Sequence, residues 1–381
     1  MIFMLRFFMI FTLLFSVVTH AANAEILVNP FSKEYPRKKT SAETRPPVGV
    51  RPCCAFGKDL KAQVGTIPVP FFSVGNILGA DAIGNHRYND GSSNVAVNLL
   101  GLSEEKNGLL FTTRGGFIDT AHVRDTADYT YYLFQHMQQY LGTHYHMDFP
   151  AELRVRRIHW QANATPLTAE ERIHLSADAA ALMAFRLAQW HEIAQWFGMV
   201  SVSGFKELAS AFSSEDLYSN MLGAQLAKNV LLTHPHMNVT EFGQAMDKAL
   251  AGALDALDVQ SAAVTDEKIT ALDGVWWDSS KRLPDKWTVI FRDYHFGLSL
   301  TPHYPGATHP LRLSTQSTSG HNIGEWVRLE LHAHDNEAAF AALPETLKQR
   351  TVWTVEQFQP LADFAEQQDR QALAEMNAQR E

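Results

Sequence analysis

A histidine and a glutamate stand side by side inside an apolar stretch near the middle of the chain. His191 and Glu192 interrupt the run A-A-A-L-M-A-F-R-L-A-Q-W-H-E-I-A-Q-W-F-G, whose composition is that of a helix buried on several sides. Removing water from an ionised carboxylate is costly unless a partner compensates. On a helix, such a pair can supply a metal ligand and a general base. The full H-E-x-x-H pattern has a second histidine four residues after the first, where this chain has Gln195.

A second carboxylate lies at a spacing that suits the same chemistry. Glu215 follows His191 by 24 residues (215 − 191) in A-F-S-S-E-D-L-Y-S-N. A helix that returns antiparallel to the first would bring Glu215 beside His191 as a further ligand. The alternative needs no metal, because Ser213 or Ser214 could cap a helix whose first turn favours acidic residues.

These three positions resemble the thermolysin-like zincin metallopeptidases. The resemblance implies that His191 and Glu215 bind zinc and that Glu192 is the general base. It covers three positions only. Gln195 departs from the family pattern, since glutamine is a poor zinc ligand, and one ligand must then come from elsewhere.

The segment R-G-G-F-I-D-T-A-H-V-R-D offers the replacement ligand. His122 is the candidate, and Asp119 lies three residues earlier, near the same helical face. Asp119 could bind the metal or orient the imidazole of His122. In the alternative interpretation, Asp119, Arg124 and Asp125 form an ion-pair network that anchors two elements, and His122 is hydrogen-bonded within it.

Other histidines alternate along strand-like stretches. His144 and His146 alternate in G-T-H-Y-H-M-D, His332 and His334 share a face near a strand end, and His295 lies in R-D-Y-H-F-G. Each could add a ligand, and none has further support from its neighbours. The chain has no G-x-S-x-G elbow, P-loop or dinucleotide glycine pattern, which argues against the enzyme classes that use them.

The first residues predict export. Arg6 precedes an apolar run over 7–18, and residues 22–24 (A-N-A) place small side chains where a signal peptidase requires them. We expect a signal peptide over 1–24 and a mature chain, periplasmic or secreted, without an integral membrane segment. An uncleaved N-terminal anchor is the alternative.

Composition narrows the classes of partner. The net charge is −9 and no run of Lys or Arg is longer than the three residues at 37–39, which argues against nucleic acid and anionic membranes as partners. The two cysteines, Cys53 and Cys54, are adjacent. Because neighbouring cysteines bridge only through a strained ring, we favour two buried thiols over a vicinal disulfide.

The apolar pattern predicts an α+β fold in one large domain over 51–342. An extended arm over 25–50 precedes it, and a helical tail over 343–381 follows. Helical periodicity predicts helices over 117–141, 177–197, 204–211, 215–232 and 240–257, within a helical core over 117–257. Ser176 is the expected N-cap of the central helix.

Strand patterns surround this core. A-E-L-R-V-R-R-I-H-W reads as one strand, and short strands are expected over 51–110. The strand-rich stretch over 269–335 includes Trp276-Trp277, W-T-V-I-F-R-D-Y-H-F-G-L-S-L and W-V-R-L-E-L-H-A-H. We expect these three segments to form a small antiparallel sheet.

Across most of its mature length the chain resembles an uncharacterised family of exported bacterial proteins and lipoproteins, labelled domain of unknown function 4056. The segments that carry the resemblance are R-P-C-C-A-F-G, G-G-F-I-D-T-A-H-V-R-D, W-H-E-I-A-Q-W-F-G and S-A-F-S-S-E-D-L-Y-S-N. The resemblance implies a location rather than an activity. This chain lacks the cysteine at the cleavage site that lipid attachment requires.

The leading functional hypothesis is an exported zinc-dependent hydrolase that cleaves peptide or cell-envelope polymer bonds. Glu192 would take the proton of a metal-activated water, and His191, Glu215, His122 and Asp119 are the candidate ligands. Two alternatives stay open. The chain could be a non-catalytic envelope protein that binds a partner and holds a buried structural charge network. It could also be a peptidase that has lost its activity, as Gln195 suggests.

Overall fold

The protein is described from a computed structural model. The structure describes residues 44–48, 51, 55–64, 67–91, 105–200, 206–335 and 337–378. The predicted signal peptide, most of the predicted arm, and Cys53 and Cys54 lie outside these residues. Among the described residues, no helix is both long and apolar enough to cross a membrane.

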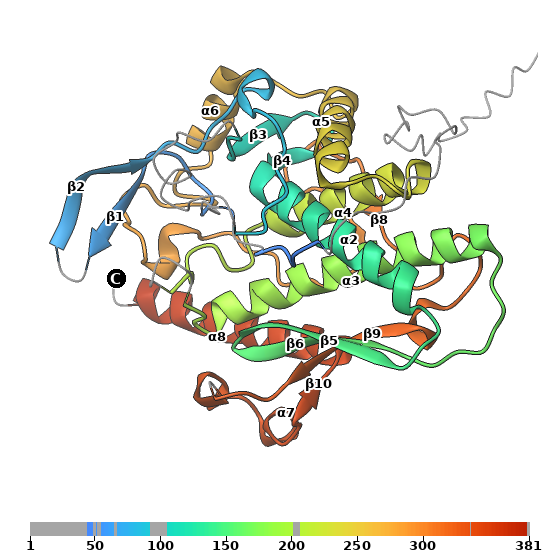
Figure 1. Cartoon of the computed structure of the whole chain (residues 1–381). Coiled ribbons are helices and arrows are strands. Elements are labelled where there is room, and N and C mark those ends of the chain that lie inside the picture. Colours follow the sequence, from blue (N-terminus) through green and yellow to red (C-terminus); the bar gives the residue numbers. More distant parts are fainter. Residues whose placement is uncertain are drawn as a thin grey trace, which may run out of the picture.

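Three long helices form the centre of the molecule (Figure 1). Helices α2 (Thr120–Tyr140), α3 (Ala169–Trp196) and α4 (Asp216–Thr233) pack against one another and share one hydrophobic cluster. Helix α5 (Val239–Ala256) packs on α4. Helix α3 is buried along most of its length, as its apolar composition predicts.

The start of α2 differs from the predicted start at 117. Residues Gly116–Asp119 form strand β4 instead, paired with β3 (Leu109–Thr112). Asp119 then caps the helix, because its Oδ1 accepts a hydrogen bond from the backbone N–H of Ala121 at 2.7 Å. The hairpin therefore delivers Asp119 to the first turn of α2.

The start of α3 differs by eight residues (177 − 169). Thr168 and Glu171 form a reciprocal capping box, which begins the helix at Ala169. Ser176, the expected N-cap, is buried inside the helix. The T-x-x-E pattern in the sequence carries this start signal.

The predicted helices over 215–232 and 240–257 are confirmed as α4 and α5, each within one residue at either end. The helix predicted over 204–211 is wrong for its described part, which consists of a bridge and turns. The Arg292 guanidinium donates to the carbonyls of Leu208, Ala209 and Ala211. A side chain thus takes carbonyls that a helix would pair with its own N–H groups.

A four-stranded antiparallel sheet lies on the opposite side of α3 from α2 and α4 (Figure 1). Its order is β10 (Val352–Trp353), β9 (Val327–His332), β6 (Arg154–Trp160) and β5 (Tyr145–Glu152). The predicted strand in W-V-R-L-E-L-H-A-H is confirmed as β9. It pairs with the strand predicted from A-E-L-R-V-R-R-I-H-W, which is β6.

The other segments expected in that sheet are mostly irregular. The stretch around Trp287–Leu300 contributes only β7 (Ser299–Leu300), which pairs with β8 (Leu311–Arg312). Trp276 and Trp277 form no strand and pack in a second hydrophobic cluster with Phe117. Burial of these large rings replaces strand pairing as the stabilising interaction.

The remaining elements complete the α+β fold, which the structure confirms. They are β1 (Leu60–Val64), β2 (Ile67–Val74), α6 (Ala262–Thr270), α7 (Glu345–Lys348), α8 (Phe358–Ala378) and the 3₁₀ turns η1 (Ala80–Ala82), η2 (Lys286–Thr288), η3 (Ile323–Glu325), η4 (Glu337–Phe340) and η5 (Val355–Gln357). Helices α7 and α8 lie in the stretch predicted as a helical tail, which also contributes strand β10 to the four-stranded sheet, and α8 packs on α3.

A glycine permits the close crossing of α2 and α4. A Cβ atom on Gly223 of α4 would overlap the carbonyl oxygen of Val123 in α2. The two backbones touch here, at the residue directly after His122 on α2 and about two turns after Asp216 on α4. The side chains at the starts of both helices are brought together as a result.

Substitution of this glycine tests the crossing. Gly223→Ala is expected to lower the free energy of unfolding by about 1–3 kcal/mol, because rigid backbone atoms must move apart. Gly252→Ala in α5 is the matched control, since its Cβ would meet nothing within 4 Å. The control should raise stability by up to about 1 kcal/mol through helix propensity. Urea denaturation of both variants measures the difference, and equal effects would rule out a tight crossing.

Candidate metal centre

Two carboxylates and one imidazole converge where α2 and α4 begin. Asp119 caps α2, His122 lies in its first turn, and Asp216 is the first residue of α4. One ligand atom from each of the three lies within 4.8 Å of the other two. All three side chains are buried. We call these residues the buried triad.

The imidazole of His122 is held between two residues of α4. Its Nδ1 lies 3.2 Å from Nδ2 of Asn220, and its Nε2 lies 3.2 Å from Oδ1 of Asp216. Asn220 is held in turn, because its Oδ1 accepts a hydrogen bond from Oγ1 of Thr126 at 2.6 Å. The ring is therefore oriented with Nε2 toward Asp216.

Several carboxylate oxygens of this region have no hydrogen-bond donor among the described residues. The buried oxygens without a donor are both oxygens of Asp216, Oδ2 of Asp119 and Oε1 of Glu192. Buried polar atoms are normally satisfied, and leaving one without a partner costs about 1–3 kcal/mol or more. Protons on the carboxyls or a bound cation would remove this cost.

Burial dominates the electrostatics of the triad. It raises the pKa of Asp119 to about 8, and it raises the pKa of Asp216 well above its ordinary value, with added repulsion from Glu215, Glu192 and Asp119. Burial lowers the pKa of His122 to about 3, so its imidazole is neutral. A neutral imidazole is the form that binds metal ions.

The positive charge near these acids is small. Arg292 is buried and lowers the pKa of Asp216. Its guanidinium donates to backbone carbonyls, including that of Lys286 at 2.6 Å, rather than to the carboxylates of the triad. The imidazolium of His191 lowers the pKa of Glu192, and His303 lowers the pKa of Glu215. Among the described residues, these few positive charges face four carboxyl groups, from Asp119, Glu192, Glu215 and Asp216. Full ionisation of all four would therefore be strongly unfavourable without a further cation.

The structure places Glu192 beside the buried triad. It is fully buried in α3, and its Oε2 accepts a hydrogen bond from the backbone N–H of Phe212 at 2.8 Å. Burial raises its pKa to about 7. It is close enough to raise the pKa of Asp216. The predicted buried carboxylate thus lies next to the candidate ligands.

Glu215 lies outside the triad. Both of its carboxylate oxygens accept hydrogen bonds from Oγ of Ser213 at 2.8 Å, and Oε2 also accepts from Ser214 at 3.3 Å. The serines expected to cap α4 therefore bind this side chain instead. Glu215 itself is the N-cap residue. Spacing along the chain favoured Glu215 as the ligand, whereas the structure brings the next residue, Asp216, to His122.

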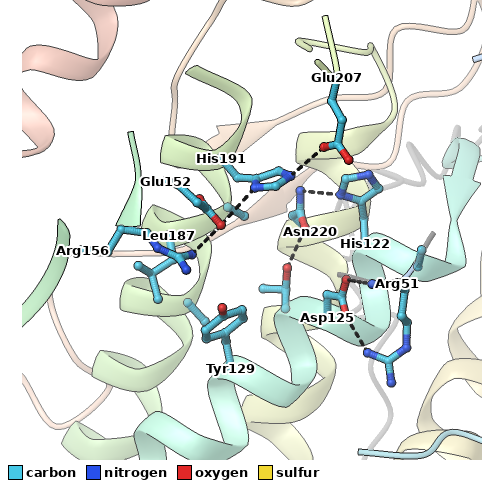
Figure 2. A pocket seen from close by; sticks show the side chains of 14 residues that line it. Arg51, His122, Asp125, Tyr129, Glu152, Arg156, Leu187, His191, Glu207 and Asn220 are labelled. Atoms are coloured by element: carbon cyan, nitrogen blue, oxygen red, sulfur yellow. Dashed lines mark hydrogen bonds and ion pairs between the residues drawn. The ribbon is translucent and has the colours of Figure 1, made fainter. Parts of the chain in front are cut away.

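His191 also lies outside the triad and lines the neighbouring cavity (Figure 2). Its Nδ1 lies 3.2 Å from Oε1 of Glu152. Its Nε2 lies 3.9 Å from Oε2 of Glu207 and 3.1 Å from the amide nitrogen Nε2 of Gln195. Burial alone would lower its pKa, but Glu152 and Glu207 raise it to about 9. An imidazolium is a poor metal ligand. Of the three residues expected to converge on a metal, His122, His191 and Glu215, only His122 belongs to the buried triad.

The cavity encloses about 50 Å³, which is room for a few water molecules. His122, Asp125 and Tyr129 enter it from one stripe of α2, and His191 enters from α3. The other lining residues are Arg51, Ala121, Thr126, Glu152, Arg156, Ala184, Leu187, Ala188, Glu207 and Asn220. His122 lines the cavity and also faces Asp216, so it joins the cavity to the triad.

Of the ion-pair network expected from Asp119, Arg124 and Asp125, only Asp125 takes part in one, because the Arg124 guanidinium donates to the backbone carbonyls of Lys106, Ile83 and Gly84 and to Asn107. Arg51 binds Asp125 at 2.6 Å, Asp128 at 2.8 Å and Glu105 at 2.6 Å. This network fastens the segment at Arg51 to α2 along one side of the cavity. The role of a structural ion pair, which the sequence offered as an alternative for all three residues, therefore applies to Asp125. Asp119 instead lies with His122 and Asp216.

Sequence reasoning missed Asp216 and Asn220 as a pair. They stand four residues apart on α4, hence on one face, and Ser219 beside them accepts a hydrogen bond from the N–H of Asp119 at 2.9 Å. The sequence signal for this pair is the four-residue spacing of two polar side chains on an otherwise apolar helix, D-L-Y-S-N-M-L-G-A-Q-L-A.

Comparison with known families gives one match. A family model described as a protein of unknown function, DUF4056, matches residues 41–305. The chain belongs to this family. The matched region of this DUF4056 protein contains the buried triad and Glu192. No curated protein and no solved structure matches the chain. The comparisons show no zincin resemblance, which therefore rests on the spacing of His191, Glu192 and Glu215 alone.

The raised carboxyl pKa values predict how metal-free stability depends on pH. Asp119, Glu192 and Glu215 keep protons in the folded state that the unfolded chain loses near pH 4. Their stabilisation is present at low pH and is lost as pH rises through about 7 to 8. The lowered pKa of His122 has the opposite effect, because stability then rises with pH from about 3 to 6.5. Above 6.5, the pKa of His122 in the unfolded chain, this contribution no longer changes.

Between pH 6.5 and 8, the free energy of unfolding of the chelator-treated protein should therefore fall by at least about 1 kcal/mol. Urea denaturation at the two pH values measures this change. The decline should be shallower in Asp216→Asn, which removes one of the interacting acids. Stability that rises over this window would contradict the protonated state of the cluster.

Proposed function

We propose that this protein is a metal-dependent hydrolase whose divalent ion is held by Asp119, His122 and Asp216. The observation that carries the proposal is the condition of Asp216. Its carboxylate is fully buried, and neither oxygen accepts a hydrogen bond from the described residues. Nε2 of the neutral imidazole of His122 lies 3.2 Å from Oδ1, and a second carboxylate, that of Asp119, lies within 4.8 Å. Such a group is unfavourable without a cation and well suited to one.

The donor set supports zinc as the ion. Two carboxylates and one neutral imidazole carry the charge that balances a divalent cation. Three protein ligands leave a position open, which is the usual arrangement of catalytic zinc sites. Carboxylate oxygens and imidazole nitrogens also bind other first-row transition-metal ions. Metal analysis of the purified protein therefore decides which ion is bound.

Asn220 and Thr126 support the imidazole. An ion on Nε2 of His122 requires a hydrogen on Nδ1, which needs an acceptor. Turning the Asn220 amide by half a rotation presents its oxygen to Nδ1. The Thr126 hydroxyl, 2.6 Å away, can then accept from the amide nitrogen. The pair can thus hold His122 in the tautomer that metal binding requires.

Glu192 is the proposed proton acceptor. A bound divalent ion lowers the pKa of a coordinated water and polarises the bond to be cleaved. Glu192 has a free buried oxygen beside the triad and a pKa raised to about 7 by burial. A carboxyl that titrates near neutrality can take a proton from water and return it to a leaving group.

The cavity is the proposed point at which the end of a substrate chain approaches His122, in place of the few water molecules for which it has room. Arg156 and His191 present positive charge there, and Glu152 and Glu207 present negative charge. Mixed charge at this scale suits a polar chain end better than an apolar ligand. Together with the predicted export, this supports a peptide or cell-envelope polymer as the substrate, acted on in the periplasm or outside the cell.

Metal analysis tests the proposed site. Wild-type protein, dialysed against zinc and then buffer, should retain one ion more per chain than Asp216→Asn. Asp178→Asn is the matched control, because Asp178 is a buried carboxylate on α3 that already accepts hydrogen bonds from Thr318. The control should retain the wild-type metal content. Equal metal content in wild type and Asp216→Asn would overturn the assignment.

The catalytic role of Glu192 has a separate test. Glu192→Gln should reduce hydrolysis of peptide and envelope-polymer substrates by at least about 100-fold, since the general base is lost. Its metal content should match that of the wild type. Asp178→Asn serves again as the control and should keep its activity. Unchanged turnover in Glu192→Gln would exclude Glu192 as the base.

A further inference from the structure

The outer face of the four-stranded sheet carries a group of histidines far from the buried triad. His146 on β5 stands directly opposite His159 on β6. His144, two residues before His146, has its ring centroid 5.4 Å from that of His159. The opposite face of the same strands is buried, with Ile158 and Trp160 fully so. Strand alternation therefore places the three imidazoles together on the exposed face.

A carboxylate orients the central imidazole. Glu330 on β9 accepts a hydrogen bond from Nδ1 of His159 at 3.0 Å, and it also contacts Nε2 of His332 at 2.9 Å and Nε of Arg328 at 2.7 Å. Burial alone would raise the pKa of Glu330, but these hydrogen bonds lower it to about 2, so the carboxylate is ionised. With Nδ1 engaged, His159 has Nε2 available as a lone-pair donor. A carboxylate behind a histidine is the usual support of a metal-ligating imidazole.

The harder oxygen ligands on this face are already engaged. Asp148 lies two residues after His146 and is held by Arg157 through two hydrogen bonds, at 2.7 and 2.8 Å. The donors that face solvent are therefore imidazole nitrogens. Nitrogen donors of this kind favour copper, nickel and zinc over magnesium or calcium.

We propose that His144, His146 and His159 form a second, surface site for a divalent transition-metal ion of the nickel–copper–zinc group. Directly opposed residues on antiparallel strands have Cβ atoms about 5 Å apart, close enough for two imidazoles to bind one ion. His144 and His146 are exposed, so their side chains can change rotamer without disturbing packed neighbours. Divalent copper binds this donor set most tightly of the three ions.

The site is independent of the proposed function. Its ligands come from β5, β6 and the turn before β5, whereas the buried triad comes from the starts of α2 and α4. Loss of one site should leave the other intact. This independence allows the surface site to be studied in protein that lacks the buried one.

Copper binding tests the proposal. Cu²⁺ is titrated into the full chain, free of any affinity tag and carrying Asp216→Asn, with calorimetry for affinity and electron paramagnetic resonance for nitrogen coordination. One Cu²⁺ with nitrogen ligands is expected. His159→Gln should weaken its affinity by at least about tenfold, and Glu330→Gln should weaken it by about 10-fold as well, through the loss of orientation.

His174→Gln is the matched control, because His174 is a partly exposed histidine on α3, outside the sheet. It should bind Cu²⁺ as the parent does. The titrations are repeated without Asp216→Asn on protein whose buried site has been loaded with zinc, which covers the case of a poorly folded parent. The proposal is overturned if His159→Gln binds Cu²⁺ as tightly as His174→Gln, or if the double variant His144→Ala/His146→Ala leaves the affinity unchanged.

Discussion

The burial of carboxylates where α2 and α4 cross is the constraint on which the centre of this protein depends. Asp119, Glu192, Glu215 and Asp216 are all withdrawn from water, and the nearby guanidinium of Arg292 is occupied mostly by backbone carbonyls. Hydrogen bonds from two serines satisfy Glu215, and one backbone N–H satisfies half of Glu192. Asp216 has neither. A cluster built only for stability would gain by replacing such a group with an apolar one, so the cluster points to a cation.

The surrounding architecture positions this cluster rather than neutralising it. The β3–β4 hairpin delivers Asp119 as the cap of α2, and Gly223 lets α4 approach close enough for Asp216 to face His122. On the cavity side, the Arg51 network holds the chain against α2. The acids are thus enclosed on the side of α3 and α4, and His122 connects them to the polar cavity. An ion held by Asp119, His122 and Asp216 would therefore have one protected and one accessible side.

Local signals predicted much of the fold. Helical periodicity gave α4 and α5 to within one residue and α2 except for its start, and alternation gave β6 and β9. Errors occurred where side chains took over backbone hydrogen bonds. The turn region that Arg292 binds was predicted as a helix, and the tryptophan-rich segments were predicted as strands although their rings are buried without strand pairing. Such interactions join residues distant in sequence and leave no periodic pattern.

The sequence by itself determined the α+β class, a buried central helix with Glu192 inside it, and a candidate ligand segment that contains Asp119 and His122. Only the tertiary structure decided which side chains meet. Successive residues of a helix point about 100° apart, so His191 and Glu192 diverge, as do Glu215 and Asp216 where α4 begins. Glu192 lies beside the triad and Asp216 belongs to it, whereas His191 and Glu215 lie outside it. The crossing of α2, α3 and α4 selects one member of each pair, and a crossing is set by packing between distant residues rather than by spacing along the chain.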